Sequence, residues 1–290
     1  MLPSRVTPGD LRAMKAEGKR IVALTAYDRP TAEICEAAGV DVLLVGDSLG
    51  NVLLGYETTL PVTMEEMLHH VKAVARSARR SLVVADLPFL SYQADLAEAL
   101  RNAGRFLKEG GAQAVKLEGG DRSAEAIERM VTAGIPVMGH IGYTPQSSHV
   151  FGKNVVQGRD VDAALTLLND ALALEEAGCF AIVLECVPRE VAQAVSERLV
   201  IPTIGIGAGA GCDGQILVFH DVVGWGAGAT LKFVKPYAQI GETLRQAVSD
   251  YARDVREGAF PAAEHAFTMP AEARALFEQE LAELDAGCGE

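Results

Sequence analysis

The stretch Glu175–Val183 reads EEAGCFAIV, and it contains the two features that decide the fold. Its first half ends in Ala-Gly, and a glycine directly after a helix is the usual left-handed cap that stops it. Its second half is a short apolar run, typical of a strand buried on both faces of a parallel sheet. The same order recurs in EAAGVDVLL (Glu36–Leu44) and VTAGIPVMG (Val131–Gly139). The sequence therefore predicts repeated units of helix and strand.

Outward from these stretches, strand and helix patterns alternate along the chain. Eight short apolar runs are predicted strands: Ile21–Ala26, Val42–Gly46, Leu82–Ala85, Ala114–Leu117, Pro136–Gly139, Ala181–Leu184, Thr203–Ile206 and Leu217–Phe219. Between them lie predicted helices: Pro30–Ala38, Met64–Ala78, Gln93–Lys108, Ser123–Ala133, Asp160–Ala177 and Glu190–Leu199. Eight such units favour a closed (β/α)8 barrel, the TIM barrel, over an open doubly wound sheet.

Two more helices, Tyr237–Glu257 and Ala271–Ala286, are predicted after the last strand. The second is acidic and carries an apolar stripe of Phe277, Leu281 and Leu284, which typically packs on a core or on another subunit. We expect one catalytic barrel domain over residues 1–267 and an acidic C-terminal helix or tail over residues 268–290.

Composition narrows the class of protein. The net charge of −13 disfavours nucleic acid and anionic membranes as partners, because both attract basic surfaces. No apolar run is long enough for a membrane span, and the N-terminus lacks the apolar core of a signal peptide, so we expect a cytoplasmic protein. The five cysteines form no CxxC pair, which argues against a zinc site.

Polar residues stand at the ends of five consecutive predicted strands. In a barrel of this kind the carboxyl ends of the strands form the active-site face. The residues are Asp47 and Ser48 after the second strand, Asp86 after the third, Lys116 and Glu118 on the fourth, His140 on the fifth and Glu185 on the sixth. Lys116 and Glu118 are two residues apart, so their side chains point to the same face of the strand. We therefore expect four carboxylates, one lysine and one histidine around one rim.

Each of these residues also has a structural interpretation. An Asp after a strand often caps a helix, and a lone His is often a hydrogen-bonded core residue. Lys116 and Glu118 could form a solvated edge pair, and Glu185 could be a cap. The joint occurrence favours a site, because four carboxylates at one rim repel one another unless a cation lies among them. Lys116 neutralises only one charge, and Mg²⁺ is the usual ion where a few carboxylates leave positions for water and substrate.

The glycine-rich stretch IPTIGIGAGAGCDGQ (Ile201–Gln215) loosely matches a dinucleotide-binding motif. That motif should open a helix in an early strand–helix–strand unit, whereas this stretch comes late and Asp213-Gly214 interrupts any helix. We expect instead a loop after the seventh strand, either a structural turn or a place where backbone approaches a ligand.

Several long strings make the chain similar to the 3-methyl-2-oxobutanoate (ketopantoate) hydroxymethyltransferase family. They occur in order from about Val6 to Phe267: LTAYD (Leu24–Asp28), VGDSLGNVLLGYETTLPVTMEEM (Val45–Met67), VVADLPF (Val83–Phe89), AVKLEGG (Ala114–Gly120), GIPVMGHIGYTPQS (Gly134–Ser147), VQGR (Val156–Arg159), LEEAGCFAIVLECVP (Leu174–Pro188) and the glycine-rich stretch. One segment departs from the family pattern: a Gly-Gly-aromatic turn usually precedes VQGR, where this chain has SHVFGKNV.

The resemblance implies a barrel of the phosphoenolpyruvate/pyruvate superfamily. It implies transfer of a hydroxymethyl group from 5,10-methylenetetrahydrofolate to 3-methyl-2-oxobutanoate, through a Mg²⁺-stabilised enolate, giving 2-dehydropantoate for pantothenate and coenzyme A. It also implies self-association as a homodecamer of two pentamer rings. The roles implied for single residues are Mg²⁺ binding by Asp47, Asp86 and Glu118, substrate binding by Asp47, Ser48, Asp86, Lys116 and His140, and proton acceptance by Glu185.

Two rival functions differ in testable features. A carbon–carbon lyase of the isocitrate lyase or phosphoenolpyruvate mutase type places a catalytic Cys in the loop after the fourth strand. That loop here is KLEGGDRSAEA, and no Cys occurs between Cys35 and Cys179. A keto-acid sensor on a barrel scaffold would need no additional proton acceptor such as Glu185.

Overall fold

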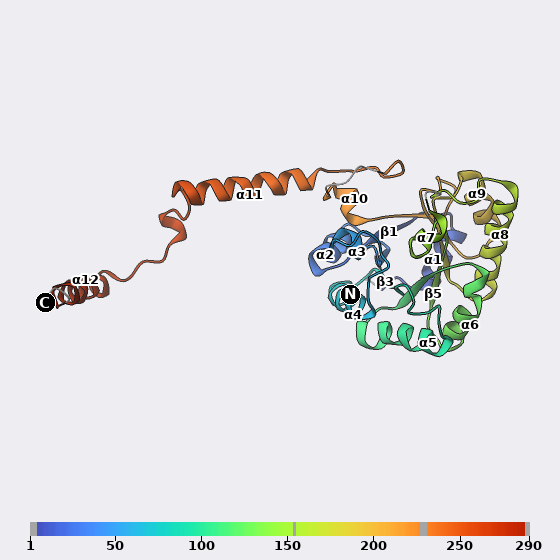
Figure 1. Ribbon diagram of the computed structural model, residues 1–290, viewed down its shortest axis with the longest axis horizontal. Coiled ribbons are helices and arrows are strands. Elements are labelled where there is room, and N and C mark those ends of the chain that lie inside the picture. The colour runs from blue at the N-terminus through green and yellow to red at the C-terminus, as the bar shows by residue number, and fades with distance from the viewer. Residues whose placement is uncertain (1–4, 153–154, 227–230, 288–290) are drawn as a thin grey trace. The chain divides into compact units, whose positions relative to one another are not determined.

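The computed structural model describes residues 5–152, 155–226 and 231–287. Its strands are β1 (Ile21–Thr25), β2 (Val42–Val45), β3 (Leu82–Asp86), β4 (Ala114–Glu118), β5 (Val137–Gly142), β6 (Ala181–Glu185), β7 (Thr203–Ile206) and β8 (Gly214–Leu217). Each strand pairs in parallel with the next, and β8 pairs with β1 to close the barrel. The predicted (β/α)8 fold is therefore confirmed (Figure 1).

Helices surround the strands in Figure 1. The longer ones are α1 (Pro8–Ala16), α2 (Arg29–Ala37), α4 (Met64–Ala75), α5 (Leu96–Arg105), α6 (Ala124–Thr132), α8 (Val161–Glu176) and α9 (Arg189–Arg198). Short α-helical turns are α3 (Leu49–Val52), α7 (Ser148–Phe151) and α10 (Phe219–Val223). The remaining turns are the π-helical η1 (Phe106–Gly110) and the 3-10 turns η2 (Asp121–Ser123) and η3 (Pro145–Ser147). The sequence pattern missed α1 and the short turns except η1, which lies mostly within the predicted helix Gln93–Lys108.

Three helices end at the Ala-Gly pairs that the sequence predicts as their C-terminal caps. Gly39, Gly134 and Gly178 come just after α2, α6 and α8 and have φ angles of 77°, 86° and 95°. This left-handed conformation is open to glycine without steric cost, so each Ala-Gly pair ends its helix and turns the chain into the next strand.

The last strand was predicted in the wrong place. The structure has β8 at Gly214–Leu217, whereas the sequence pattern predicted Leu217–Phe219, and Phe219 instead begins α10. Gly214 resembles a turn residue, but it lies opposite Ile21 of β1. A Cβ at this position would be 2.6 Å from the Ile21 carbonyl oxygen, so the closing strand pair needs a residue without a side chain.

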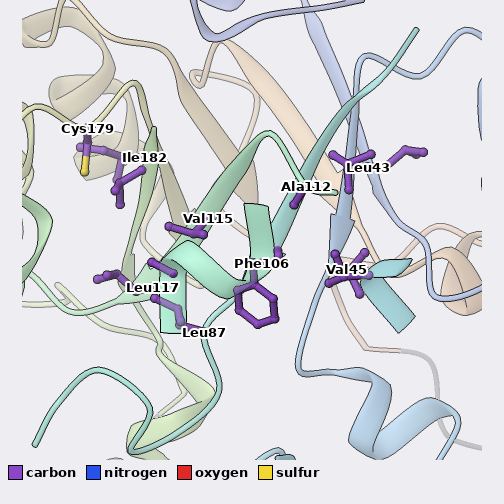
Figure 2. Packing of buried hydrophobic residues seen from close by; sticks show 14 of the residues in the cluster. Leu43, Val45, Leu87, Phe106, Ala112, Val115, Leu117, Cys179 and Ile182 are labelled. Carbon is purple, nitrogen blue, oxygen red and sulfur yellow. The ribbon is translucent and has the colours of Figure 1, made fainter. Parts of the chain in front are cut away.

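Alternating strand residues build two layers of core. One cluster fills the barrel interior and includes Leu44, Val84, Ala114, Met138 and Val183. The other lies between the strands and the helices; Figure 2 shows Leu43, Val45, Val115 and Leu117 of that layer with Phe106 of η1. Because successive strand residues point to opposite faces, the polar residue at each strand end belongs to one layer or the other by its position alone.

The chain divides into two compact units, Met1–Ala238 and Gln239–Glu290. The second unit contains α11 (Ile240–Glu257), the 3-10 turn η4 (Ala263–His265) and α12 (Ala271–Gly287). The domain boundary proposed from sequence, at residues 267/268, falls inside this second unit. In the described ranges, no helix combines the length and apolarity that crossing a membrane requires.

Candidate active site

A cavity of about 330 Å³ lies at the carboxyl ends of the strands. The structure places all seven residues predicted from the sequence in its lining: Asp47, Ser48, Asp86, Lys116, Glu118, His140 and Glu185. They come from five consecutive strands or from the residues that follow them. The structure therefore gathers the predicted residues around one space.

The inward-facing rows of the strands position these side chains. Ala114 belongs to the interior cluster, and Lys116 and Glu118 continue its row at intervals of two residues. The corresponding rows are Leu82, Val84 and Asp86 on β3, Met138 and His140 on β5, and Ala181, Val183 and Glu185 on β6. Each row is apolar deep in the barrel and ends in a charged or polar group at the cavity. The alternation that packs the core therefore also places the site.

Lys116 lies among the acidic groups. Its Nζ is 2.8 Å from Oδ1 of Asp86 and 3.2 Å from Nδ1 of His140, and all three side chains are buried. Burial by itself would lower the pKa of Lys116, but the charges of Asp86, Glu118 and Asp47 outweigh burial and raise it. Lys116 is therefore a cation in the folded protein, and its ammonium group donates a hydrogen bond to Nδ1 of His140.

The carboxylates outnumber this cation. Burial raises the pKa of Asp86 to about 7, with Lys116 opposing the rise and Asp47 adding to it. Burial, reinforced by the charge of Asp47, also raises the pKa of Glu118 well above its usual range. The Asp47 backbone N–H donates to Oδ2 of Asp86 at 3.3 Å, while Oδ1 of Asp86 faces the ammonium group of Lys116 at 2.8 Å. With one lysine among several carboxylates, the site is short of positive charge.

Glu185 and His140 lie next to each other in the cavity, and His140 is also the neighbour of Lys116. Nε2 of His140 is 3.2 Å from Oε2 of Glu185, a contact that lacks hydrogen-bond geometry. Burial, with the charge of Lys116 adding to it, lowers the pKa of His140 well below its usual range, so its ring is neutral at pH 7. Burial raises the pKa of Glu185 to about 7, with Lys116 opposing. A carboxylate with such a pKa is matched to proton transfer near neutral pH.

Ser48 lies beside a tyrosine that the sequence interpretation did not single out. Its Oγ is 2.8 Å from Oη of Tyr27, whose ring is fully buried. Burial raises the pKa of Tyr27, so the phenol stays protonated and can orient the serine hydroxyl. The pattern LTAYD, which follows a strand directly, is the sequence signal that could have identified Tyr27.

Two further polar residues behind the carboxylates were missed. Gln146, in η3, donates through Nε2 to Oδ2 of Asp47 at 3.0 Å and through its backbone N–H to Oε2 of Glu118 at 3.0 Å. Tyr92 Oη accepts from the Glu118 backbone N–H at 3.1 Å and donates to Oε1 of Gln146 at 2.9 Å. Both lie in loops after strands, outside the strand-end positions on which the sequence search concentrated.

The glycine-rich stretch has a structural use. Added Cβ atoms at Gly207, Gly209 and Gly211 would lie 3.0, 2.6 and 2.9 Å from side-chain atoms of Phe233, Arg189 and Gln193. These contacts favour a packed turn and do not support an approach of this backbone to a ligand. The residue of this stretch that lines the cavity is Ile206, the last residue of β7, which precedes the loop.

The segment that departs from the family pattern forms the short helix α7, and Lys153 and Asn154 lie outside the described residues.

Four cysteines, Cys35, Cys179, Cys186 and Cys212, are buried free thiols, as predicted, while Cys288 lies outside the described ranges.

Comparison with solved structures gives the barrel type. The chain is similar to phosphonopyruvate hydrolase (TM-score 0.59, 15% identity, covering 96% of each chain). It is also similar to 2,3-dimethylmalate lyase, described as a PEP mutase/isocitrate lyase superfamily member (TM-score 0.58, 17% identity, covering 99% of this chain and 100% of the other). At such identities the likeness concerns the fold alone, and it agrees with the predicted (β/α)8 barrel.

Comparison of sequences gives the family. The chain is 59% identical to the 3-methyl-2-oxobutanoate hydroxymethyltransferase of Carboxydothermus hydrogenoformans, over 92% of this chain and 97% of the relative. It is 55% identical to the enzyme of the same name from Syntrophus aciditrophicus, over 91% and 97%. The family model described as ketopantoate hydroxymethyltransferase matches residues 5–263. The chain therefore belongs to the ketopantoate hydroxymethyltransferase family.

Proposed function

We propose that this protein transfers a hydroxymethyl group from 5,10-methylenetetrahydrofolate to 3-methyl-2-oxobutanoate, giving 2-dehydropantoate, a step in pantothenate biosynthesis. The observation that carries the proposal is the shared cavity of the seven predicted residues, in a chain of this family. The cavity holds a cation for a carboxylate substrate and a base with a pKa near 7, which a carbon–carbon bond formation through an enolate requires.

The residues fit a Mg²⁺ ion. Asp47, Asp86 and Glu118 would hold it, because their hard oxygen atoms are the ligands that Mg²⁺ prefers and Lys116 leaves them with excess negative charge. Oε1 of Glu118, which is 3.7 Å from Nδ1 of His140 and receives no hydrogen bond from the described residues, is available as a ligand. Within the described ranges no three Asp, Glu, His or Cys side chains are arranged so that they alone could hold a metal ion, so the carboxylates would need water and substrate oxygens to complete the shell.

Bound there, Mg²⁺ would polarise the keto group of the 2-oxo acid and so acidify the neighbouring C–H. Lys116, fixed as a cation, offsets the negative charge of the acid and of the enolate derived from it. Ser48, held by Tyr27, is placed to donate a hydrogen bond to a substrate oxygen.

Glu185 accepts the proton from C3 of the keto acid. The electron pair left on that carbon forms the new bond to the methylene carbon of the folate. Both C–N bonds of that methylene group break, and water supplies the hydroxyl group. The proton held by Glu185 and the second proton of water go to the two folate nitrogens, so the products are 2-dehydropantoate and tetrahydrofolate. Neutral His140 lies between Lys116 and Glu185, so it separates the cation from the base and contributes no charge of its own. Residues of the barrel interior such as Leu44 and Val183 line the floor of the cavity, where they exclude water from the reacting carbon.

A two-stage assay tests this function. The protein is mixed with 3-methyl-2-oxobutanoate and Mg²⁺ in D₂O, and exchange of the C3 proton is followed by NMR. Methylenetetrahydrofolate is then added, and 2-dehydropantoate is measured by mass spectrometry. Exchange followed by product is the expected result. Binding of the keto acid without exchange would indicate a sensor, and cleavage of a carbon–carbon bond would indicate the lyase alternative.

The family resemblance also motivates two proposals about the protein in the cell. A homodecamer of two pentamer rings should sediment as one species of ten chains in analytical ultracentrifugation. A cytoplasmic location should place the protein in the cytosolic fraction after cell lysis.

A further inference from the structure

Gln146 is a buried glutamine, 5% exposed, in the turn η3 that follows β5. The residues on either side of this turn, Pro145 and Ser148, reach the cavity wall. Gln146 itself contacts two of the cavity carboxylates, those of Asp47 and Glu118, which come from different strands. It therefore connects two parts of the site that are 71 positions apart in the chain, from Asp47 to Glu118.

Every hydrogen-bonding atom of the Gln146 side chain is used. Nε2 donates to Oδ2 of Asp47 at 3.0 Å and to the carbonyl oxygen of Leu87 at 2.9 Å. Oε1 accepts from Oη of Tyr92 at 2.9 Å and from Nε2 of Gln93 at 3.1 Å. An amide has two donor hydrogens and two acceptor lone pairs, so the set is complete.

These partners also determine which way the amide faces. The carbonyl of Leu87 and the carboxylate of Asp47 only accept, so the nitrogen must face them. The Tyr92 hydroxyl already accepts from the Glu118 backbone N–H at 3.1 Å, and its one proton is then free to bond Oε1. The Glu118 carbonyl, which also lies near this hydroxyl, has a second donor in Oγ of Ser123 at 3.0 Å.

Gln146 hydrogen-bonds to one oxygen of each carboxylate. Its side-chain Nε2 donates to Oδ2 of Asp47, and its backbone N–H donates to Oε2 of Glu118. Oδ1 of Asp47 and Oε1 of Glu118 receive no hydrogen bond from the residues that the structure describes; Oε1 is 3.7 Å from Nδ1 of His140. Each carboxylate is thus held by one oxygen and presents the other.

We propose that Gln146 is a positioning residue, which fixes the orientation of the Asp47 and Glu118 carboxylates so that one oxygen of each serves the bound ion and the 2-oxo acid. This inference rests on the proposed function for the identity of the ligands, whereas the hydrogen bonds themselves do not depend on it. Groups that orient metal ligands in this way are worth about 10–100-fold in metal affinity or activity.

The test compares Gln146→Leu and Gln146→Met with the control Gln113→Leu in the full-length protein. Both Gln146 variants lose the four side-chain hydrogen bonds and keep the backbone N–H and the bulk. Gln113 also has a side chain bonded through both atoms, to the backbone of Val83 and Gly111, but it lies at the opposite end of β4. Mg²⁺ binding is measured by calorimetry with MgCl₂ alone, and the KM for the keto acid and kcat are measured separately.

We expect the Gln146 variants to bind Mg²⁺ about 10–100-fold more weakly and to raise the KM for the keto acid, while Gln113→Leu stays within about twofold of the wild type. Mg²⁺ affinity and KM within about twofold of the wild type in a folded Gln146 variant would overturn the proposal.

Crystal structures of the wild type and Gln146→Leu separate this inference from the proposed function. If the wild type binds no Mg²⁺, the metal assignment fails, and the structures alone decide the role of Gln146. Rotated Asp47 and Glu118 carboxylates in the variant support positioning by Gln146. Carboxylates that keep their wild-type orientation overturn it.

Discussion

Replacing Lys116 with methionine should destabilise the protein in a strongly pH-dependent way. Lys116 is the cation beside Asp86, at 2.8 Å, and both side chains are at most 4% exposed. At that distance the attraction is about 6 kcal/mol for an effective dielectric constant near 20, before the desolvation of both ions is subtracted. Removing one partner of such a buried pair typically costs about 3–5 kcal/mol, because the other charge is left uncompensated.

Protonation of Asp86 limits this cost at low pH. Its pKa in the folded protein is about 7, raised by burial and held down by Lys116, so losing the lysine raises the pKa further. A carboxylic acid with a raised folded-state pKa contributes stability that is complete below its unfolded pKa and is lost as pH rises through the folded pKa. Below pH 7, Asp86 is protonated in both the wild type and Lys116→Met. Above pH 7, Asp86 ionises in the wild type but stays protonated in the variant. The variant therefore loses free energy of unfolding relative to the wild type, by about 1.4 kcal/mol per pH unit, or about 3 kcal/mol by pH 9.

The assay is urea unfolding followed by circular dichroism at pH 6 and pH 9, at one protein concentration. The matched control is Lys19→Met, which breaks the exposed 2.7 Å ion pair with Glu17 and should leave the free energy of unfolding nearly unchanged at both pH values, because solvent screens exposed ion pairs. We expect the loss for Lys116→Met to grow by about 3 kcal/mol between the two pH values. An equal loss at pH 6 and pH 9 would refute the coupling of Lys116 to Asp86.

Three further predictions, made with four substitutions, test other parts of the structure. Glu185→Gln should lower kcat about 10²–10⁴-fold with little change in keto-acid binding. Because the active form of a base with a pKa of about 7 is ionised, the wild-type rate should rise through pH 7 and the variant should lose that rise, which steady-state kinetics from pH 5.5 to 8.5 would show. Asp47→Ala and Glu118→Ala should each weaken Mg²⁺ and keto-acid binding together, as calorimetry measures; unchanged affinities in both would remove the metal assignment. Gly214→Ala should lower the melting temperature, at a cost of about 1–3 kcal/mol, because its Cβ would meet the Ile21 carbonyl at 2.6 Å; an unchanged melting temperature would show that the closing strand pair adjusts freely.

The sequence predicted the barrel because each strand–helix unit has its own local signals. The Ala-Gly stops before β2, β5 and β6 need only a left-handed backbone, and the apolar runs need only a buried sheet. The misplaced β8 shows the limit of such signals. Gly214 stands in its strand because of a close approach to Ile21, nearly 200 residues away, and no local pattern reports that contact.

The site could be predicted as far as it depends on strand ends. Lys116 and Glu118 were found because two charged residues at an interval of two cannot both belong to an apolar interior. Gln146 and Tyr92 were missed because their importance comes from hydrogen bonds to other loops, and an uncharged residue in a turn has no unusual feature in the sequence.

The balance of charge explains why the site is recognised only as a group. Any one of Asp47, Asp86, Glu118 or Glu185 would be an ordinary strand-end residue, but together they face a single lysine in a space that excludes most water. Burial raises the pKa values of Asp86, Glu118 and Glu185, and the charge of Asp47 adds to the rise for Asp86 and Glu118, so without a further cation these carboxyl groups tend to keep their protons. A divalent ion would displace protons from its ligands but not from the base, which lies across His140 from Lys116. The arrangement thus gives the carboxylates two different roles: those near Lys116 are suited to hold an ion, and Glu185 remains available to exchange a proton near pH 7.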